Sequence, residues 1–114
     1  MPTTMSDVYE IVAGQKVFLT VMIGDADVGG SVVELDGDRI LKGDVDNQDL
    51  GDGNGLKGKK LRIKTVVVDV NPHTNNTSVT YSLKGGARPK EWPLSEPVSN
   101  EGDAMKYDGE ISFV

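Results

Sequence analysis

The chain has 114 residues, no cysteine and a formal net charge of −6. Its length suits one domain with one core, its charge opposes binding to nucleic acid or anionic membranes, and the lack of cysteine excludes disulfides and thiolate zinc sites. No apolar run reaches the ~18 residues of a membrane span, and residues 1–7 lack the basic start and apolar stretch of a signal peptide. We therefore expect a cytoplasmic protein without a membrane span.

The first strand candidates are a short segment, residues 8–13, and a clearer one, residues 16–23, in which aliphatic residues recur with period two. The segment 16–23 places four aliphatic side chains on one face and Phe18 and Met22 on the other. Such a strand is either buried on both faces or exposes apolar surface. Residues 24–30 follow as a turn or short loop.

A β-hairpin is predicted from residues 31–35 and 38–42, because Asp36-Gly37 between strands favours a two-residue type I′ turn. The turn sets the register of the two strands. That register places Leu35 opposite Asp38, Glu34 opposite Arg39, Val33 opposite Ile40 and Val32 opposite Leu41.

The longest predicted strand pair is formed by residues 59–70 and 77–84. Apolar residues occupy odd positions early in the first strand and even positions later, whereas the second strand stays odd throughout. A period-two pattern changes phase when a residue is inserted or when the strand changes layers. We therefore predict a bulge or bend between Lys64 and Val67, with Lys60, Arg62 and Lys64 on the solvent face.

After Lys84 the alternation stops, and residues 85–103 are predicted to form a long connection that contains three prolines and Trp92. A last strand, 110–114, is predicted to pair with 104–107 through a turn at Asp108-Gly109. The pattern predicts an all-β fold over residues 1–114, a single two-layer antiparallel β-sandwich of seven or eight strands. A small β-barrel is the alternative.

The segment 44–55 combines carboxylates, amides and glycines, which suits a hard cation such as calcium. Asp25 and Asp27 could join it if the loops share one end of the sandwich. An ordinary solvated turn selects the same residue types. The candidate ligands within this segment are Asp44, Asp46, Asp49, Asp52 and Asn54.

No catalytic constellation accompanies the single histidine, His73, which we expect in an exposed turn. Trp92 either pins its loop to the sandwich or contacts a partner, since tryptophan and arginine are enriched at binding hot spots. Candidate partner-binding residues are Trp92, Arg88, Phe18 and Met22.

We therefore expect a non-enzymatic module that binds another protein or itself and needs no cofactor. The alternative is a calcium-dependent module whose loop 44–55 binds a carbohydrate, a lipid or a surface. The two hypotheses differ in whether calcium stabilises the chain.

Overall fold

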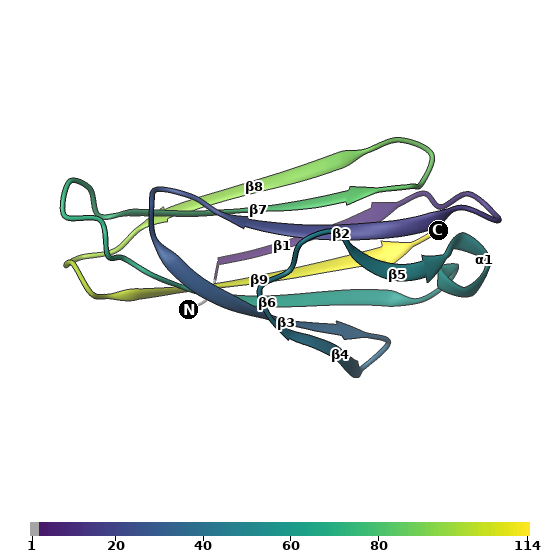
Figure 1. Cartoon of the computed structure of the whole chain (residues 1–114), viewed down its shortest axis with the longest axis horizontal. Coiled ribbons are helices and arrows are strands. Elements are labelled where there is room, and N and C mark those ends of the chain that lie inside the picture. Colours follow the sequence, from purple (N-terminus) through teal and green to yellow (C-terminus); the bar gives the residue numbers. More distant parts are fainter. Residues whose placement is uncertain (1–2) are drawn as a thin grey trace.

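The computed structural model describes residues 3–114, and Met1 and Pro2 of the predicted domain lie outside the described residues. The described chain forms two sheets that pack as a sandwich and do not close into a barrel, which confirms the predicted all-β fold (Figure 1). The strand orders are β1-β9-β6-β3-β4 in the five-stranded sheet and β5-β2-β7-β8 in the four-stranded sheet. The elements are β1 (Thr3–Tyr9), β2 (Lys16–Ile23), β3 (Val28–Leu35), β4 (Asp38–Gly43), β5 (Gln48–Asp52), α1 (Gly53–Leu56), β6 (Lys60–Val68), β7 (Asn76–Lys84), β8 (Lys90–Pro97) and β9 (Ala104–Phe113).

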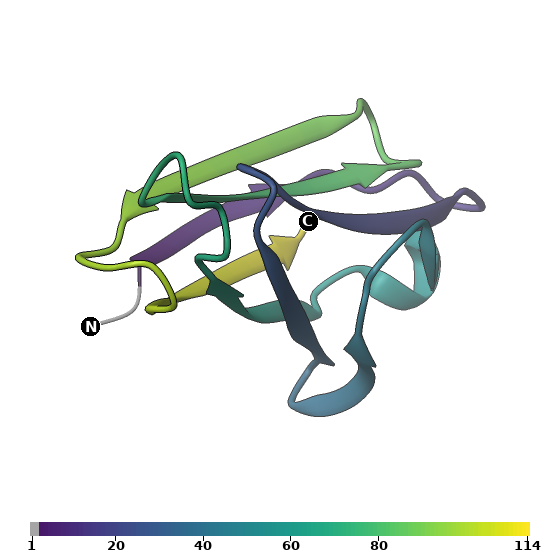
Figure 2. The same cartoon turned by 60° about the vertical axis from the view of Figure 1, so that its left-hand side comes forward.

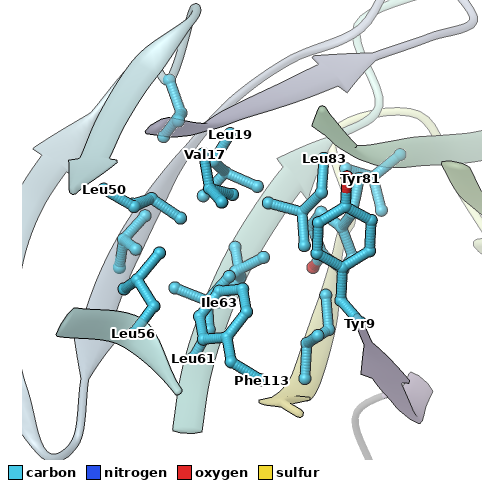
Figure 3. Packing of buried hydrophobic residues seen from close by; sticks show 14 of the residues in the cluster. Tyr9, Val17, Leu19, Leu50, Leu56, Leu61, Ile63, Tyr81, Leu83 and Phe113 are labelled. Carbon is cyan, nitrogen blue, oxygen red and sulfur yellow. The ribbon is translucent and has the colours of Figure 1, made fainter. Parts of the chain in front are cut away.

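The core lies between the two sheets and consists of side chains that alternate along each strand. Figure 3 shows Leu19 and Leu83 of the four-stranded sheet lying across from Ile63 and Phe113 of the five-stranded sheet. All four are at most 1% exposed. Burial of such side chains contributes roughly 1.5–3 kcal/mol each, so these alternating positions carry most of the packing energy.

The N-terminal strand begins earlier than predicted, at Thr3 instead of Val8, and it runs parallel to β9. The other strand pairs are antiparallel. The pairing of Tyr9 with Phe113 ends this parallel ladder. The chain then turns back through residues 10–15 into β2.

The hairpin at Asp36-Gly37 is confirmed, and both turn residues have the positive φ that a type I′ turn requires (53° and 90°). Leu35 lies opposite Asp38 and Glu34 opposite Arg39, as predicted. Beyond them the predicted register is wrong by one residue. The outer strand bulges at Ile40, so Leu41 lies opposite Val33 and packs against the core while Ile40 is exposed. The hairpin projects from the body of the sandwich (Figure 2).

The predicted pairing of residues 59–70 with 77–84 is wrong, because β6 and β7 lie in different sheets. β6 pairs with β3 and β9 without interruption from Lys60 to Val68, so it contains no bulge. The buried positions of β6 remain odd-numbered throughout, because the polar residue Thr65 is buried between Ile63 and Val67. Its hydroxyl is hydrogen-bonded to Ser31 Oγ (2.8 Å) and the Tyr81 hydroxyl (3.2 Å).

Two further corrections concern the C-terminal third of the chain. The segment 85–103 is not one long loop, because β8 forms within it and pairs with β7 as an edge strand. An edge strand tolerates Pro93 and Pro97, since the outer side needs no amide donor. Asp108-Gly109 is not a turn but the middle of β9. Glycine is needed there because a Cβ would lie 2.7 Å from Cε2 of Tyr81.

Candidate functional site

A groove opens beside β2, where the two sheets separate at one edge of the sandwich. It has a volume of about 560 Å³ and is lined by the end of β2, the start of β3 and the loop between β4 and β5. Met22 and Val28, both in its lining, are 62% and 55% exposed. Exposed apolar side chains rimmed by polar groups are typical of interaction surfaces.

The backbone of β2 is only partly paired on the side of this groove. β5 pairs with β2 from Lys16 to Leu19, and beyond that point Val21 N–H donates to the carbonyl oxygen of Val45 (2.9 Å). Alternate residues of an antiparallel strand direct their backbone groups to the same side. Ile23 therefore directs its N–H and C=O into the groove, beyond the part of β2 that pairs with β5.

The groove is acidic. Three carboxylate residues line it, Asp27, Asp44 and Asp46, and no lysine or arginine does. Asp44 and Asp46 are exposed, so their charges face solvent and any ligand that enters. The groove therefore combines apolar contacts, free backbone hydrogen-bonding groups and negative charge.

A second feature lies at the end of the sandwich opposite α1, where three connections meet on the left of Figure 1. They join β2 to β3, β6 to β7 and β8 to β9. Asp27 Oδ1 accepts hydrogen bonds from the backbone N–H groups of Val70 (3.1 Å) and Asn71 (3.2 Å). Asp69 N–H donates to the Asp103 carbonyl oxygen (2.9 Å), which joins the third connection to the other two.

Asp69 is completely buried at this end of the sandwich. The backbone N–H of Asn71 donates to Oδ1 of both Asp69 (3.3 Å) and Asp27 (3.2 Å), so the two carboxyl groups are neighbours. The Oδ2 atoms of both residues are buried, and neither finds a hydrogen-bond donor among the described residues. Burial raises the pKa of Asp69, and the nearby negative charge of Asp27 raises it further.

The predicted calcium ligands of segment 44–55 are only partly brought together. Asp44 and Asp46 line the groove with Asp27, whereas Asp49 and Asp52 lie on β5 and Asn54 on α1. The segment contains β5 and α1, so its carboxylates serve separate local roles. Asp49 accepts from Gly51 N–H (2.8 Å) and pairs with Lys16 (3.2 Å), and both contacts lower its pKa. Asp52 caps α1 through Gly55 N–H (3.2 Å), and Asn54 lies exposed on that helix. Nowhere in residues 3–114 do three or more histidine, cysteine, aspartate or glutamate side chains form one metal-binding group.

Asp25 and Asp27 lie in the turn between β2 and β3, as the sequence suggested. Asp27 lines the groove with Asp44 and Asp46 and also lies beside Asp69. The Asp25 side chain is exposed, and its carbonyl oxygen accepts from Asn71 Nδ2 (2.9 Å). Sequence reasoning missed Asp69. A signal was present, because acidic residues recur two positions from another acid or amide in Asp25-Ala26-Asp27, Asp69-Val70-Asn71 and Glu101-Gly102-Asp103.

The predicted partner-binding residues lie in three places. Phe18 and Met22 share the outer face of the four-stranded sheet, and Met22 reaches the groove. Arg88 is exposed in the connection between β7 and β8, beside a smaller hollow of about 440 Å³. Trp92 is half-buried on the inner face of β8.

Trp92 closes the edge of the sandwich where β1 and β8 meet. Its indole N–H donates to Asp7 Oδ2 (2.8 Å), and its ring packs edge-on against Tyr9 at 6.3 Å between centroids. Lys90 pairs with the same Asp7 oxygen (2.8 Å). These contacts hold the pKa of Asp7 well below its usual range, chiefly through the hydrogen bond from Lys90. Trp92 thus pins β8 to β1, the first of its two predicted roles.

The basic residues of β6 lie on the solvent face, as predicted, and each has an acidic neighbour. Lys60 pairs with Glu110, Arg62 with Asp108 and Lys64 with Glu34, all at 3.1 Å. The acidic partners come from β9 and β3. These cross-strand pairs leave little net positive charge for an anionic ligand.

Comparison with protein-family models, with curated proteins and with solved structures finds no match to this chain. In the described part of the chain, no helix has the length and apolar character needed to cross a membrane.

Proposed function

We propose that this protein is a non-enzymatic interaction module whose groove beside β2 receives an extended segment of a partner protein. The observation that carries the proposal is the unpaired end of β2, which offers the backbone groups of Ile23 next to exposed Met22 and Val28. An extended peptide can add to such an edge through main-chain hydrogen bonds, and its side chains then select the sequence.

The charge of the groove indicates the chemistry of that segment. Because Asp27, Asp44 and Asp46 line the groove without a basic residue, a segment with lysine or arginine is favoured. Met22 and Val28 favour apolar side chains at alternate positions. The occupant is therefore an extended basic and apolar peptide of another protein.

A second copy of this chain fits the groove less well. The basic strip on β6 is the best internal match in charge, but its three residues already pair with Glu110, Asp108 and Glu34. The chain as a whole carries a net charge of −6, so two copies repel each other.

A random nine-residue peptide library displayed on phage tests the proposal. We expect the selected peptides to combine lysine or arginine with β-branched residues, and backbone amide shifts on peptide addition to map to residues 20–29 and 44–46. Met22→Lys and Asp46→Lys should each weaken the binding of a selected peptide by about tenfold or more, as anchor changes do.

Val66→Lys is the matched control, because Val66 is also an exposed apolar residue (41%) but lies on β6 and is not part of the groove lining. Peptides that lack basic residues, or an equal loss of affinity in Val66→Lys and Met22→Lys, would contradict the proposal. A dimer in solution that Met22→Lys dissociates would instead identify a second copy as the occupant.

A further inference from the structure

At the end of the sandwich opposite α1, here called the acidic end, the surrounding protein groups do not satisfy two buried carboxylate groups. Asp27 Oδ2 and Asp69 Oδ2 are both buried without a donor among the described residues. While both carboxylates are ionised they only accept hydrogen bonds, so neither can then satisfy the other. Buried charges are normally paired or coordinate a metal ion. A positive species between the two oxygens would satisfy both.

The backbone holds these two oxygens in place. The other oxygen of each carboxylate accepts from backbone amides, Asp27 Oδ1 from Val70 and Asn71 and Asp69 Oδ1 from Asn71 (3.3 Å). The carbonyl oxygen of Asp69 accepts from Gly102 N–H (2.8 Å). These hydrogen bonds to the backbone of the connections therefore fix the positions of the two carboxylate groups and their Oδ2 atoms.

The charge around them favours a cation over a shared proton. The connecting segments 24–27, 69–75 and 98–103 contain five acidic residues and no lysine or arginine. One shared proton would neutralise one of these charges, whereas a divalent ion would offset two. Glu101 lies near enough for its charge to act on Asp69, so it adds to the negative potential at the same place.

We propose that Asp27 and Asp69 bind a hard divalent cation of the calcium class at this end of the sandwich. Calcium accepts carboxylate, carbonyl and water oxygens in flexible geometry, so carbonyl and water oxygens would complete the shell of roughly six to eight ligands around the two carboxylates. Magnesium demands a stricter octahedral shell and gives up water reluctantly. The inference does not rest on the peptide groove, and it moves the calcium hypothesis from segment 44–55 to another set of residues.

Thermal unfolding of the full chain, followed by circular dichroism with calcium chloride or with a chelator, tests the site. Weak calcium sites of protein modules bind with Kd of roughly 10⁻⁴–10⁻³ M, so about 10 mM calcium reaches at least a tenfold excess. Stabilisation by mass action at that excess raises the Tm by about 5 °C. Asp69→Asn should abolish the rise. Asp46→Asn, in the segment first considered, should keep it.

Nuclear magnetic resonance of the unaltered chain keeps the test independent of whether Asp69→Asn folds. Calcium should shift the amide signals of Val70, Asn71 and Gly102, which bond to the Asp27 carboxylate or to Asp69. The absence of any Tm rise and amide shift at 10 mM calcium would overturn the proposal and leave a shared proton as the explanation. Amide shifts confined to residues 44–55, or an equal Tm rise in Asp69→Asn, would also overturn it.

Discussion

The buried hydroxyl of Thr65 is the most direct test of how this sandwich is held together. Thr65 is 1% exposed, and it links Ser31 Oγ on β3 to the Tyr81 hydroxyl of the opposite sheet. Thr65→Val keeps the shape of the side chain and removes both hydrogen bonds. It also leaves the hydroxyls of Ser31 and Tyr81 buried without their partner.

The expected loss of stability in Thr65→Val follows from these two hydrogen bonds. A neutral hydrogen bond contributes about 0.5–1.5 kcal/mol net, so the loss of two predicts a decrease of about 1–3 kcal/mol in the free energy of unfolding. For a chain of this length that corresponds to a fall in Tm of about 4–12 °C. Tyr81→Phe alone removes one of the two bonds and should cost about half as much.

Urea unfolding followed by tryptophan fluorescence measures the effect, with Thr80→Val on the outer face of β7, the strand of Tyr81, as the control. In the double variant Thr65→Val with Tyr81→Phe, the loss should be smaller than the sum of the single losses, because both changes remove the same bond. An unchanged unfolding midpoint in Thr65→Val, or strict additivity in the double variant, would refute the assigned network.

Three further predictions concern other parts of the fold. Because its partners hold the pKa of Asp7 below its usual range, Asp7→Asn should destabilise the protein at pH 5–7, and urea unfolding should show this deficit shrink as the pH falls below about 3.9, where the unfolded carboxyl takes up a proton. Gly109→Ala should lower the unfolding free energy by about 1–3 kcal/mol, because its Cβ would lie 2.7 Å from the Tyr81 ring; an unchanged Tm would show that the ring can move aside. Ala26→Gly should raise stability by about 1 kcal/mol, because Ala26 has a φ of 56° that glycine adopts without strain; a lower Tm would contradict this.

The structural features that could be predicted best from the sequence are those that depend only on neighbouring residues. The Asp36-Gly37 turn and the strands beside it were predicted correctly, since a type I′ turn is specified by its own two residues. The bulge at Ile40 was not, because it depends on Leu41 reaching a core that other strands build.

The errors arose where a tertiary contact overrides the local pattern. Thr65 interrupts the apolar run of β6, and only its hydrogen bonds to Ser31 and Tyr81 explain why a polar residue is buried there. The phase change therefore suggested a bulge where there is none. β8 was taken for a loop because prolines are rare in central strands, but this strand lies at the edge of its sheet.

The candidate sites also depend on tertiary contacts that the local sequence pattern does not reveal. Composition drew attention to segment 44–55, whose carboxylates turned out to cap a helix, pair with Lys16 or face the groove. The acidic spacing around Asp69 also occurs elsewhere in the sequence, and the importance of Asp69 comes from its complete burial beside Asp27. The packing of the three connections decides which acidic residues are buried. The number of acidic residues in a segment does not.

Asp27 links the two proposed sites, because it lines the groove and also supplies one of the two buried oxygens. A cation held there would offset part of the negative charge that favours a basic peptide, so the two ligands should oppose each other where they share this carboxylate. Asp69 belongs to the cation site and Met22 to the groove, and neither residue lies in both. Asp69→Asn should therefore remove the calcium response without abolishing peptide binding, whereas Met22→Lys should do the reverse. Loss of both activities in either variant would mean that the groove and the acidic end form one site.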